Sequence, residues 1–343
     1  MKDVMALMRP NILALEPYST ARDEWQGGDI DVWIDANESP YDNGVNRYPD
    51  PHHKILRAQL SEIKGVGADS IFIGNGSDEA IDILFRVFAR PGVDNAVSIA
   101  PTYGMYKVAA ATNDVAMREV QLNADYSLPV DKLLAACDEN TKLMWVCSPN
   151  NPTGNSFEKA DIERLITGFN GVVVVDEAYV EFASNGGFAA DLAKYPNLVI
   201  LQTLSKAWGM AGLRFGLALA NADIITIMNR VKYPYNINVL TQARVSEELK
   251  KDITSQVSEI LEQRSRLAGE LSKCECIEAV YPSDANFLLV KVTDADRLYD
   301  ALVEQGVIVR NRSKVKGCES TLRITVGSSK ECDRVIKVVK DFR

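Results

Sequence analysis

The sequence predicts an α/β protein with two domains, and three observations lead to this prediction. Between about residues 70 and 220, apolar runs of strand length alternate with segments of helix length, which is typical of a mainly parallel sheet with helices on both faces. The chain has 343 residues, enough for two domains and a large core. After residue 237 the alternation resumes on a smaller scale, so we expect a smaller α/β domain there.

Seven apolar runs are the candidate strands of the larger sheet. In chain order they are Ile71–Ile73, Ala96–Ile99, Ala116–Val120, Leu143–Cys147, Val172–Val175, Leu198–Leu201 and Phe215–Leu219. The segments between them, such as Ser77–Arg90 and Glu158–Phe169, have the length of helices. Together they predict a large domain built on a mainly parallel seven-stranded sheet.

The second part of the chain begins with a long helical segment. Residues 238–273 contain no proline and one glycine, which predicts a long helix, continuous or interrupted, between the two domains. Four apolar runs and two helices follow, the runs being Ile277–Val280, Asn286–Val292, Val307–Arg310 and Leu322–Val326. We therefore divide the chain into residues 1–45 (an N-terminal arm and part of the small domain), 46–240 (the large domain) and 241–343 (the small C-terminal domain).

Composition and charge argue against several classes of function. The net charge is −9 and no basic stripe is present, so a nucleic-acid partner is not expected. No apolar run approaches the roughly 18–20 residues that cross a bilayer, and the N-terminal residues lack a signal peptide, so we expect a cytoplasmic protein. The six cysteines lack zinc or disulfide spacing and the only histidines, His52 and His53, are adjacent, so no metal site is expected.

One loop segment points to specific chemistry. Lys206 lies between Ser205 and small residues after the run Leu198–Leu201, and Arg214 follows among glycines. Lysine is the side chain that forms a Schiff base with an aldehyde once its amine has lost its proton, and glycines let a flat cofactor approach the backbone. The segment 204–216 resembles the lysine motif of fold-type I aminotransferases, which use pyridoxal phosphate (PLP). The resemblance implies the fold of the PLP-dependent transferases of fold type I, and a solvated surface lysine is the alternative.

Two polar clusters upstream match the same family in the same order. Residues 148–154 follow Leu143–Cys147, and residues 176–179 follow Val172–Val175. Both clusters therefore lie at the carboxyl ends of expected strands, where open α/β sheets bind their ligands. Asn, Pro and Gly also form ordinary turns, so turn chemistry accounts equally well for Asn151 taken alone. The order of the segments and their spacing to Lys206 favour the family resemblance.

The resemblance implies three catalytic residues and several contacts to the cofactor ring. Lys206 supplies the amine for the aldehyde, Asp176 pairs with the ring nitrogen, and Tyr179 with Asn151 donates hydrogen bonds to the ring hydroxyl oxygen. The alternative for Asp176 is a helix N-cap. Tyr103 matches an aromatic residue that stacks on the ring, and a position in the core is its other interpretation.

The cofactor phosphate is expected at the start of a helix. Residues 74–79 follow a strand and open a helix, so their backbone N–H groups point at an anion, although Glu79 replaces the third glycine of a dinucleotide fingerprint. Tyr48 resembles a tyrosine that reaches the phosphate from the neighbouring subunit, which implies a homodimer with shared active sites; a surface loop is the alternative. The other implied contacts are Gly76, Ser77, Asp78, Thr203, Ser205 and Arg214.

Within the family, the resemblance is strongest to the histidinol-phosphate aminotransferase branch and covers essentially the whole chain. The segments that carry it are residues 17–22, 35–40, 46–49 and 74–79 and the strand that contains Arg323. That branch transfers an amino group between histidinol phosphate and 2-oxoglutarate, giving imidazole acetol phosphate and glutamate in histidine biosynthesis. The resemblance therefore implies this reaction and these small-molecule substrates for the chain.

An arginine within an apolar strand indicates an anion site, because a buried arginine is costly unless an anion meets it. The resemblance makes Arg323 the main anchor of the substrate's anionic end and Arg310 a second anchor, with Tyr18 and Asn37 closing the pocket; a surface position is the alternative for Arg310. A threonine-phosphate decarboxylase or a broad aromatic aminotransferase would share the fold. A PLP-fold regulator is the non-enzymatic alternative, but the chain has neither an added DNA-binding domain nor basic charge.

Overall fold

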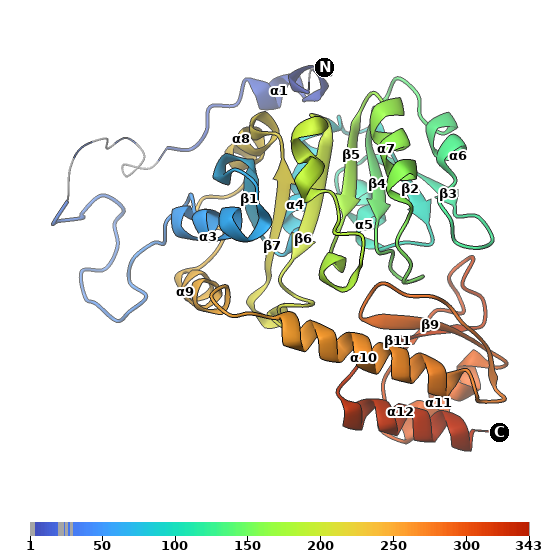
Figure 1. The fold of residues 1–343 in the computed structure, drawn as a ribbon. Helices are drawn as coiled ribbons and strands as arrows, with labels where there is room; N and C mark the ends of the chain where they lie inside the picture. Colours follow the sequence, from blue (N-terminus) through green and yellow to red (C-terminus); the bar gives the residue numbers. More distant parts are fainter. Residues whose placement is uncertain (1–3, 20–23, 25–26, 28–29, 343) are drawn as a thin grey trace.

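The computed structural model describes residues 4–19, 24, 27 and 30–342, which form two sheets flanked by helices (Figure 1). The larger sheet has seven strands in the order β1-β7-β6-β5-β4-β2-β3. Strands β2 to β6 run parallel, and β7 is antiparallel to both of its neighbours, so the predicted mainly parallel seven-stranded sheet is confirmed. The strands are β1 (Ile71–Asn75), β2 (Asn95–Ala100), β3 (Ala116–Gln121), β4 (Thr141–Cys147), β5 (Val172–Asp176), β6 (Leu198–Thr203) and β7 (Phe215–Ala220).

Two separate hydrophobic cores form because the central strands are apolar on both faces. In β5, Val173 and Val175 pack into one core and Val172 and Val174 into the other. Such a strand needs helices on both sides of the sheet. The first core is covered by α3 (Lys54–Lys64), α6 (Val130–Ala135), α7 (Lys159–Gly168) and α9 (Val239–Glu248), and the second by α4 (Ser77–Phe88), α5 (Met105–Thr112) and α8 (Ala222–Val231).

The C-terminal part forms a smaller antiparallel sheet with its own core. Its strand order is β10-β11-β9-β8, with β8 (Ile277–Val280), β9 (Phe287–Val292), β10 (Arg310–Asn311) and β11 (Thr321–Thr325). Helices α11 (Ala295–Glu304) and α12 (Ser329–Asp341) pack on it. The 18-residue helix α10 (Thr254–Leu271) runs from the large domain to this sheet (Figure 1). The expected helix over residues 238–273 is therefore interrupted, between α9 and α10.

One strand of the small domain is shorter than the sequence indicates. The sequence predicts a strand over Val307–Arg310, but β10 contains only Arg310 and Asn311. Gly306 turns the chain with a φ of 69°, and Ile308 is then 75% exposed to solvent. Val307 and Val309 pack on the small core without pairing to a strand, so their apolar character reflects core packing.

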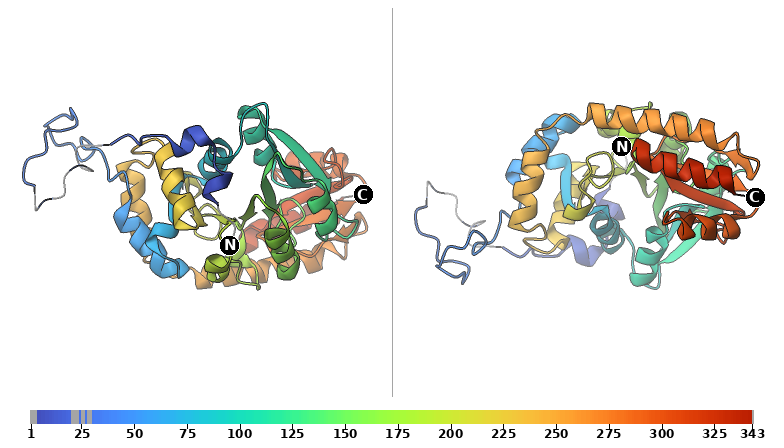
Figure 2. Two further views of the ribbon diagram at one scale, coloured as in Figure 1. Left: turned by 90° about the horizontal axis from the view of Figure 1, so that it is seen from above. Right: turned by 90° about the horizontal axis from the view of Figure 1, so that it is seen from below.

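The N-terminal residues lie on the large domain. Val4 and Met8 are buried in the core beside α4 and α8, and the backbone N–H of Arg9 donates to the carbonyl oxygen of Val87. The short helix α1 (Pro10–Leu13) follows, and residues 30–49 then extend away on the side opposite the small domain (Figure 2). From the sequence, part of residues 1–45 is assigned to the small domain. This assignment and the other domain limits stay predictions. No helix in the described part of the chain is long and apolar enough to cross a membrane.

The start of α4 packs against β7 through two facing glycines, Gly74 and Gly216, which are paired between β1 and β7. A Cβ atom on Gly216 would lie 2.1 Å from the backbone nitrogen of Ser77 and 2.4 Å from the carbonyl carbon of Gly76. These neighbours are backbone atoms, which cannot move aside as the end of a flexible side chain can. The register of β7 therefore fixes where α4 begins.

We expect Gly216→Ala to destabilise the fold by at least about 1–3 kcal/mol, because the added methyl group must displace backbone atoms. Urea unfolding midpoints of the two proteins measure this difference. Gly212→Ala is the matched control, since nothing lies within 4 Å of a Cβ atom there. A Gly216→Ala protein as stable as this control would contradict the close approach of α4 and β7.

Candidate active site

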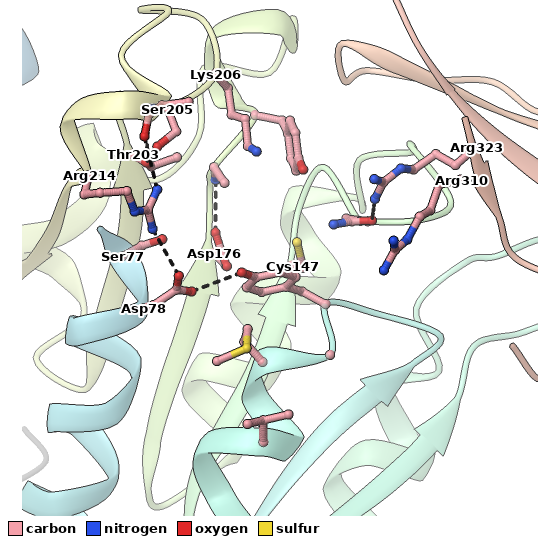
Figure 3. A pocket seen from close by; sticks show the side chains of 18 of the residues that line it. Ser77, Asp78, Cys147, Asp176, Thr203, Ser205, Lys206, Arg214, Arg310 and Arg323 are labelled. Carbon is pink, nitrogen blue, oxygen red and sulfur yellow. Dashed lines mark hydrogen bonds and ion pairs between the residues drawn. The ribbon is translucent and has the colours of Figure 1, made fainter. Parts of the chain in front are cut away.

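A cavity of about 620 Å³ lies at the carboxyl ends of the parallel strands and is closed on one side by the small domain. Most of the sequence-predicted site residues line it. Figure 3 shows Ser77, Asp78 and Arg214 at one end of the cavity, Lys206 and Asp176 in the middle, and Arg310 and Arg323 at the other end. The remaining lining residues are Tyr103, Gly104, Met105, Val108, Cys147, Asn151, Ala178, Tyr179, Thr203, Ser205, Ala211 and Arg312.

Asp176 is a carboxylate at the end of the most apolar strand of the sheet. It is 3% exposed and follows four valines in β5. Its oxygens accept hydrogen bonds from the hydroxyl of Tyr106 (2.6 Å) and the backbone N–H of Ala178 (3.1 Å). Burial raises the pKa of Asp176 to about 6, although these hydrogen bonds and the charge of Lys206 oppose the shift. Within the described residues, the two groups that hydrogen-bond to this buried acid are both uncharged.

Lys206 follows β6 and points into the middle of the cavity (Figure 3). Its ammonium nitrogen lies 5.6 Å from the centre of the Tyr179 ring. Burial lowers the pKa of Lys206, and the positive charges of Arg323 and Arg214 lower it further, while Asp176 acts in the opposite direction. A larger fraction of the amine is therefore neutral than on an ordinary surface lysine, which is the form that attacks a carbonyl or accepts a proton.

The end of the cavity at α4 is built to hold an anion. Gly76 is the N-cap of α4 with a φ of 78° and has no side chain to cap the helix, so the first N–H groups and the helix dipole face the cavity. Arg214, in a left-handed conformation with a φ of 50°, lies beside them and contacts Asp78 at 3.3 Å. The hydroxyls of Thr203 and Ser205 are 2.9 Å apart at the same place. The φ of 78° favours glycine at position 76, and a Cβ atom there would also lie 2.7 Å from Arg214 Nη2.

Tyr103 forms part of the wall between the anion-binding end and the middle. Its hydroxyl donates to Asp78 at 3.0 Å, and its ring packs edge-on against Tyr106. Burial and the charge of Asp78 raise the pKa of Tyr103 well above its ordinary value, so the hydroxyl stays protonated and remains a donor. The hydrogen bond and the ring contact hold the Tyr103 ring in the wall of the cavity.

The small domain contributes a cluster of arginines to the other end. Arg323 on β11 is paired directly opposite Arg310 on β10, and its Nη1 donates to Asn151 Oδ1 at 2.5 Å. The guanidinium of Arg323 also lies over the ring of Phe287, at 5.2 Å from its centre. Like charges opposite one another destabilise a strand pair, so this arrangement indicates an anion site. The hydrogen bond to Asn151 joins the small domain to the large one.

Three residues of the site with polar or titratable side chains are not predicted from the sequence: Arg312 and Cys147, which line the cavity, and Tyr106, whose hydroxyl donates to Asp176. Arg312 comes two residues after Arg310, and side chains two residues apart in a strand point to the same face of the sheet. Its spacing from Arg310 could therefore have predicted its position in the cavity. Tyr106 is buried and stacks on Trp145, so its sequence position is typical of ordinary core. Cys147 is paired with Asp176 in the register of β4 and β5, a placement that requires the sheet order.

Apart from Gly76, which caps α4 beside the lining residue Ser77, three predicted site residues do not line the cavity of their own chain. Tyr48 stacks on Tyr235 with ring centres 4.4 Å apart, and Asn37 lines a separate groove with it. Tyr18 is 73% exposed. Residues 20–22 of the predicted N-terminal motif lie outside the described part of the chain. The role expected for Tyr48 is in the site of a neighbouring subunit, and the roles expected for Tyr18 and Asn37 stay predictions.

Comparison with known proteins shows the family. The family model described as "Aminotransferase class I and II" matches residues 19–339. The histidinol-phosphate aminotransferase of Parabacteroides distasonis is 49% identical over 345 residues, which span 100% of both chains. The chain belongs to the class I and II aminotransferase family. The histidinol-phosphate aminotransferase of Flavobacterium johnsoniae is 46% identical over 98% of both chains.

Solved structures of the aminotransferase family share this fold. The histidinol-phosphate aminotransferase of Clostridium acetobutylicum matches with a TM-score of 0.80 at 23% identity, over 87% of this chain and 90% of that one. The Sinorhizobium meliloti enzyme, in complex with pyridoxal-5'-phosphate, matches with a TM-score of 0.76 at 22% identity, over 86% and 82%. These similarities confirm the expected fold class.

The residues present in the cavity fit the cofactor of this family, PLP. The buried carboxylate of Asp176 matches a protonated ring nitrogen, and the amine of Lys206 matches an aldehyde. The open N-terminus of α4, with Arg214 and two hydroxyl groups beside it, matches a phosphate. These three features lie together in one cavity of the described chain.

The raised pKa of Asp176 gives a pH-dependent prediction for the cofactor-free protein. The folded-state pKa of about 6 lies above the ordinary value of 3.8, so the stability that protonation provides is complete below about pH 4 and is lost as the pH rises through 6. Asp176→Asn should therefore stabilise the cofactor-free protein at pH 7.5, by at most roughly 2–3 kcal/mol, and much less at pH 4.5. Urea unfolding at both pH values tests this. A destabilisation of equal size at both would identify Asp176 as a helix cap.

Proposed function

We propose that the chain transfers an amino group between histidinol phosphate and 2-oxoglutarate, giving imidazole acetol phosphate and glutamate. The observation that carries this proposal is the single cavity in which Lys206 and Asp176 face an arginine cluster of the small domain. The relatives named histidinol-phosphate aminotransferase, which match over the full chain, support it. We expect the reaction to serve histidine biosynthesis in the cytoplasm.

The large domain would hold the cofactor. Arg214 and the N–H groups at the start of α4, with the hydroxyls of Thr203 and Ser205, would bind its phosphate. Tyr103 would cover the ring, and Asn151 and Tyr179 would lie near the ring hydroxyl. When bound, PLP accepts the electrons that remain when a bond to the substrate's Cα breaks.

Asp176 and Lys206 would divide the proton chemistry between them. Asp176 would hold a proton on the ring nitrogen, and Tyr106 orients this carboxylate through its 2.6 Å hydrogen bond. Lys206 Nζ would take the proton from the substrate's Cα and return it on the other side of the substrate nitrogen, because its lowered pKa leaves part of the amine neutral. The walls formed by Tyr103 and Tyr179 limit the access of water to this region.

The arginine cluster would bind the anionic end of either substrate. Arg323 is held in position by Asn151, and its planar fork can donate to two oxygens of a carboxylate or of a phosphate. Arg310 adds a second charge opposite it. Since phosphate and carboxylate oxygens have similar spacing, one site can accept both the phosphate ester and the dicarboxylate.

The arm supports a homodimer in which each chain completes the other's site. Residues 30–49 leave the body of the molecule, and their large apolar side chains Val32, Ile34 and Tyr41 are exposed. An exposed apolar surface of this kind is typical of a segment that packs against another chain. We propose that Tyr48, Tyr18 and Asn37 act in the cavity of a second copy, because they do not reach the cavity of their own chain.

Two other activities share this fold. The L-threonine-O-3-phosphate decarboxylase of Porphyromonas gingivalis matches with a TM-score of 0.73 at 24% identity, over 87% of this chain and 91% of that one, which is a likeness of fold. A broad aromatic aminotransferase is the other alternative. Incubation with histidinol phosphate and 2-oxoglutarate, and separately with L-threonine O-3-phosphate alone, decides among them. We expect glutamate to form in the first mixture and no carbon dioxide to be released in the second. Failure to use histidinol phosphate would remove the substrate assignment.

We expect Lys206→Ala to abolish nearly all turnover, because it removes the group that moves the proton. General acid–base catalysis alone accounts for about 10²–10⁴-fold of the rate. Borohydride treatment followed by peptide mass spectrometry should place a pyridoxyl group on Lys206 of the parent protein and find none in the variant. Substantial transamination by a correctly folded Lys206→Ala protein would contradict the assignment.

Arg323→Lys should impair both half-reactions, because lysine keeps the charge but loses the planar fork. Arg310→Ala should impair the reaction with histidinol phosphate more than that with glutamate, by about ten- to a hundredfold, the effect of one lost charge-assisted hydrogen bond or two. Each half-reaction can be followed alone through the absorbance of the bound cofactor after one amino donor is added. Equal losses for both donors in Arg310→Ala would show that Arg310 is structural.

A further inference from the structure

Arg312 is the third small-domain arginine that lines the cavity, and the role proposed above for Arg323 and Arg310 leaves it unassigned. Its backbone N–H donates to the carbonyl oxygen of Thr321 at 2.9 Å, which continues the pairing of β10 with β11 beyond Asn311. Arg312 and Arg310 stand two residues apart along this extended segment, so their side chains emerge on the same side. Both line the cavity together with Arg323.

The side chain of Arg312 is half-buried without the partners that a buried guanidinium needs. Its Nε atom is buried and has no hydrogen-bond partner among the described residues. Arg323, by contrast, is anchored to Asn151. A buried polar group without a hydrogen-bond partner destabilises the folded protein, so such groups are rare in proteins. A ligand that hydrogen-bonds to the group would remove this cost.

The charges around Arg312 are also uncompensated. Burial lowers the pKa of Arg312, and the positive charges of Arg323 and Arg310 lower it further. The groups that act in the other direction are Cys318 and Tyr179, whose own pKa values are raised by burial, so both are neutral at neutral pH. Among the described residues that line the cavity, the acids Asp78 and Asp176 lie at the opposite end and in the middle. Three cations therefore share the small-domain end of the cavity.

We propose that Arg312 determines specificity for the phosphate end of the substrate by supplying the third guanidinium that a phosphate dianion requires and a carboxylate does not. This inference rests on the proposed reaction with histidinol phosphate. A phosphate monoester presents three terminal oxygens and a charge of about −1.5 to −2 at neutral pH, whereas a carboxylate presents two oxygens and a single charge. Arg323 and Arg310 suffice for the carboxylate, and the third fork adds an interaction that the dianion alone can use.

The test is Arg312→Gln in the intact holoenzyme, with each half-reaction followed separately. We expect kcat/KM for histidinol phosphate to fall by about ten- to a hundredfold, mainly through KM, while kcat/KM for glutamate changes by less than about threefold. Arg312→Lys, which keeps the charge, should lose less than Arg312→Gln with the phosphate substrate. Arg334→Gln is the matched control, because Arg334 is an exposed arginine of the small domain outside the cavity.

A second measurement separates a ligand-binding role from a structural one. Because Arg312→Gln removes an uncompensated half-buried charge, the thermal midpoint of the holoenzyme without substrate should be unchanged or higher. The rise in midpoint that saturating histidinol phosphate produces should be smaller in the variant than in the parent enzyme. A lower midpoint without substrate, together with an unchanged ligand-induced rise, would mean that Arg312 supports the fold.

The outcomes distinguish this inference from the proposed function. If the parent enzyme uses histidinol as well as histidinol phosphate, the assignment of the substrate fails. If the parent enzyme requires the phosphate but Arg312→Gln keeps that preference, or loses activity equally with glutamate, the role of Arg312 is overturned and the reaction stands.

Discussion

The organisation of this protein depends on one buried carboxylate, that of Asp176, at the end of an otherwise apolar strand. Burying it is unfavourable, as its raised pKa shows, and two hydrogen bonds offset only part of the cost. A group of this kind is retained where a cationic ligand meets it. Four valines precede Asp176 in its strand, and helices cover both faces of the sheet there, so the carboxylate is held in a fixed position.

The cavity separates charge along its length. Arg214 and the N-terminus of α4 attract an anion at one end, Asp176 attracts a cation in the middle, and the small-domain arginines attract a second anion at the far end. A cofactor with a phosphate and a basic ring, joined to a substrate with an anionic tail, has the complementary order. The contact between Arg323 and Asn151 ties the far end to the large domain, so the spacing between the charges is set by how the two domains pack.

Much of this arrangement can be predicted from the sequence. Apolar runs such as Val172–Val175 indicate strands because a strand that is buried on both faces admits few polar residues. Polar clusters that follow such runs share one edge of the sheet, so the sequence alone is enough to place Asp176 and Asn151 near each other. The assignment of roles needs the family resemblance, since spacing alone does not separate a ring contact from a turn.

The parts that the sequence does not predict depend on tertiary context. Tyr106 lies in a helix and packs like a core residue, and its contact with Asp176 forms only when α5 is docked on the sheet. The run Val307–Val309 has the composition of a strand, but it packs on the small core without a strand partner. The position of Tyr48 outside its own cavity reflects an arm whose partner is another chain in our proposal.

We propose that Asp176 keeps a proton on the ring nitrogen of the cofactor. The most direct measurement is the ¹⁵N chemical shift of that nitrogen in holoenzyme reconstituted with ¹⁵N-labelled PLP. The account predicts the shift of a protonated pyridinium in the parent enzyme and that of a neutral pyridine in Asp176→Asn. A neutral ring nitrogen in the parent enzyme at neutral pH would contradict it.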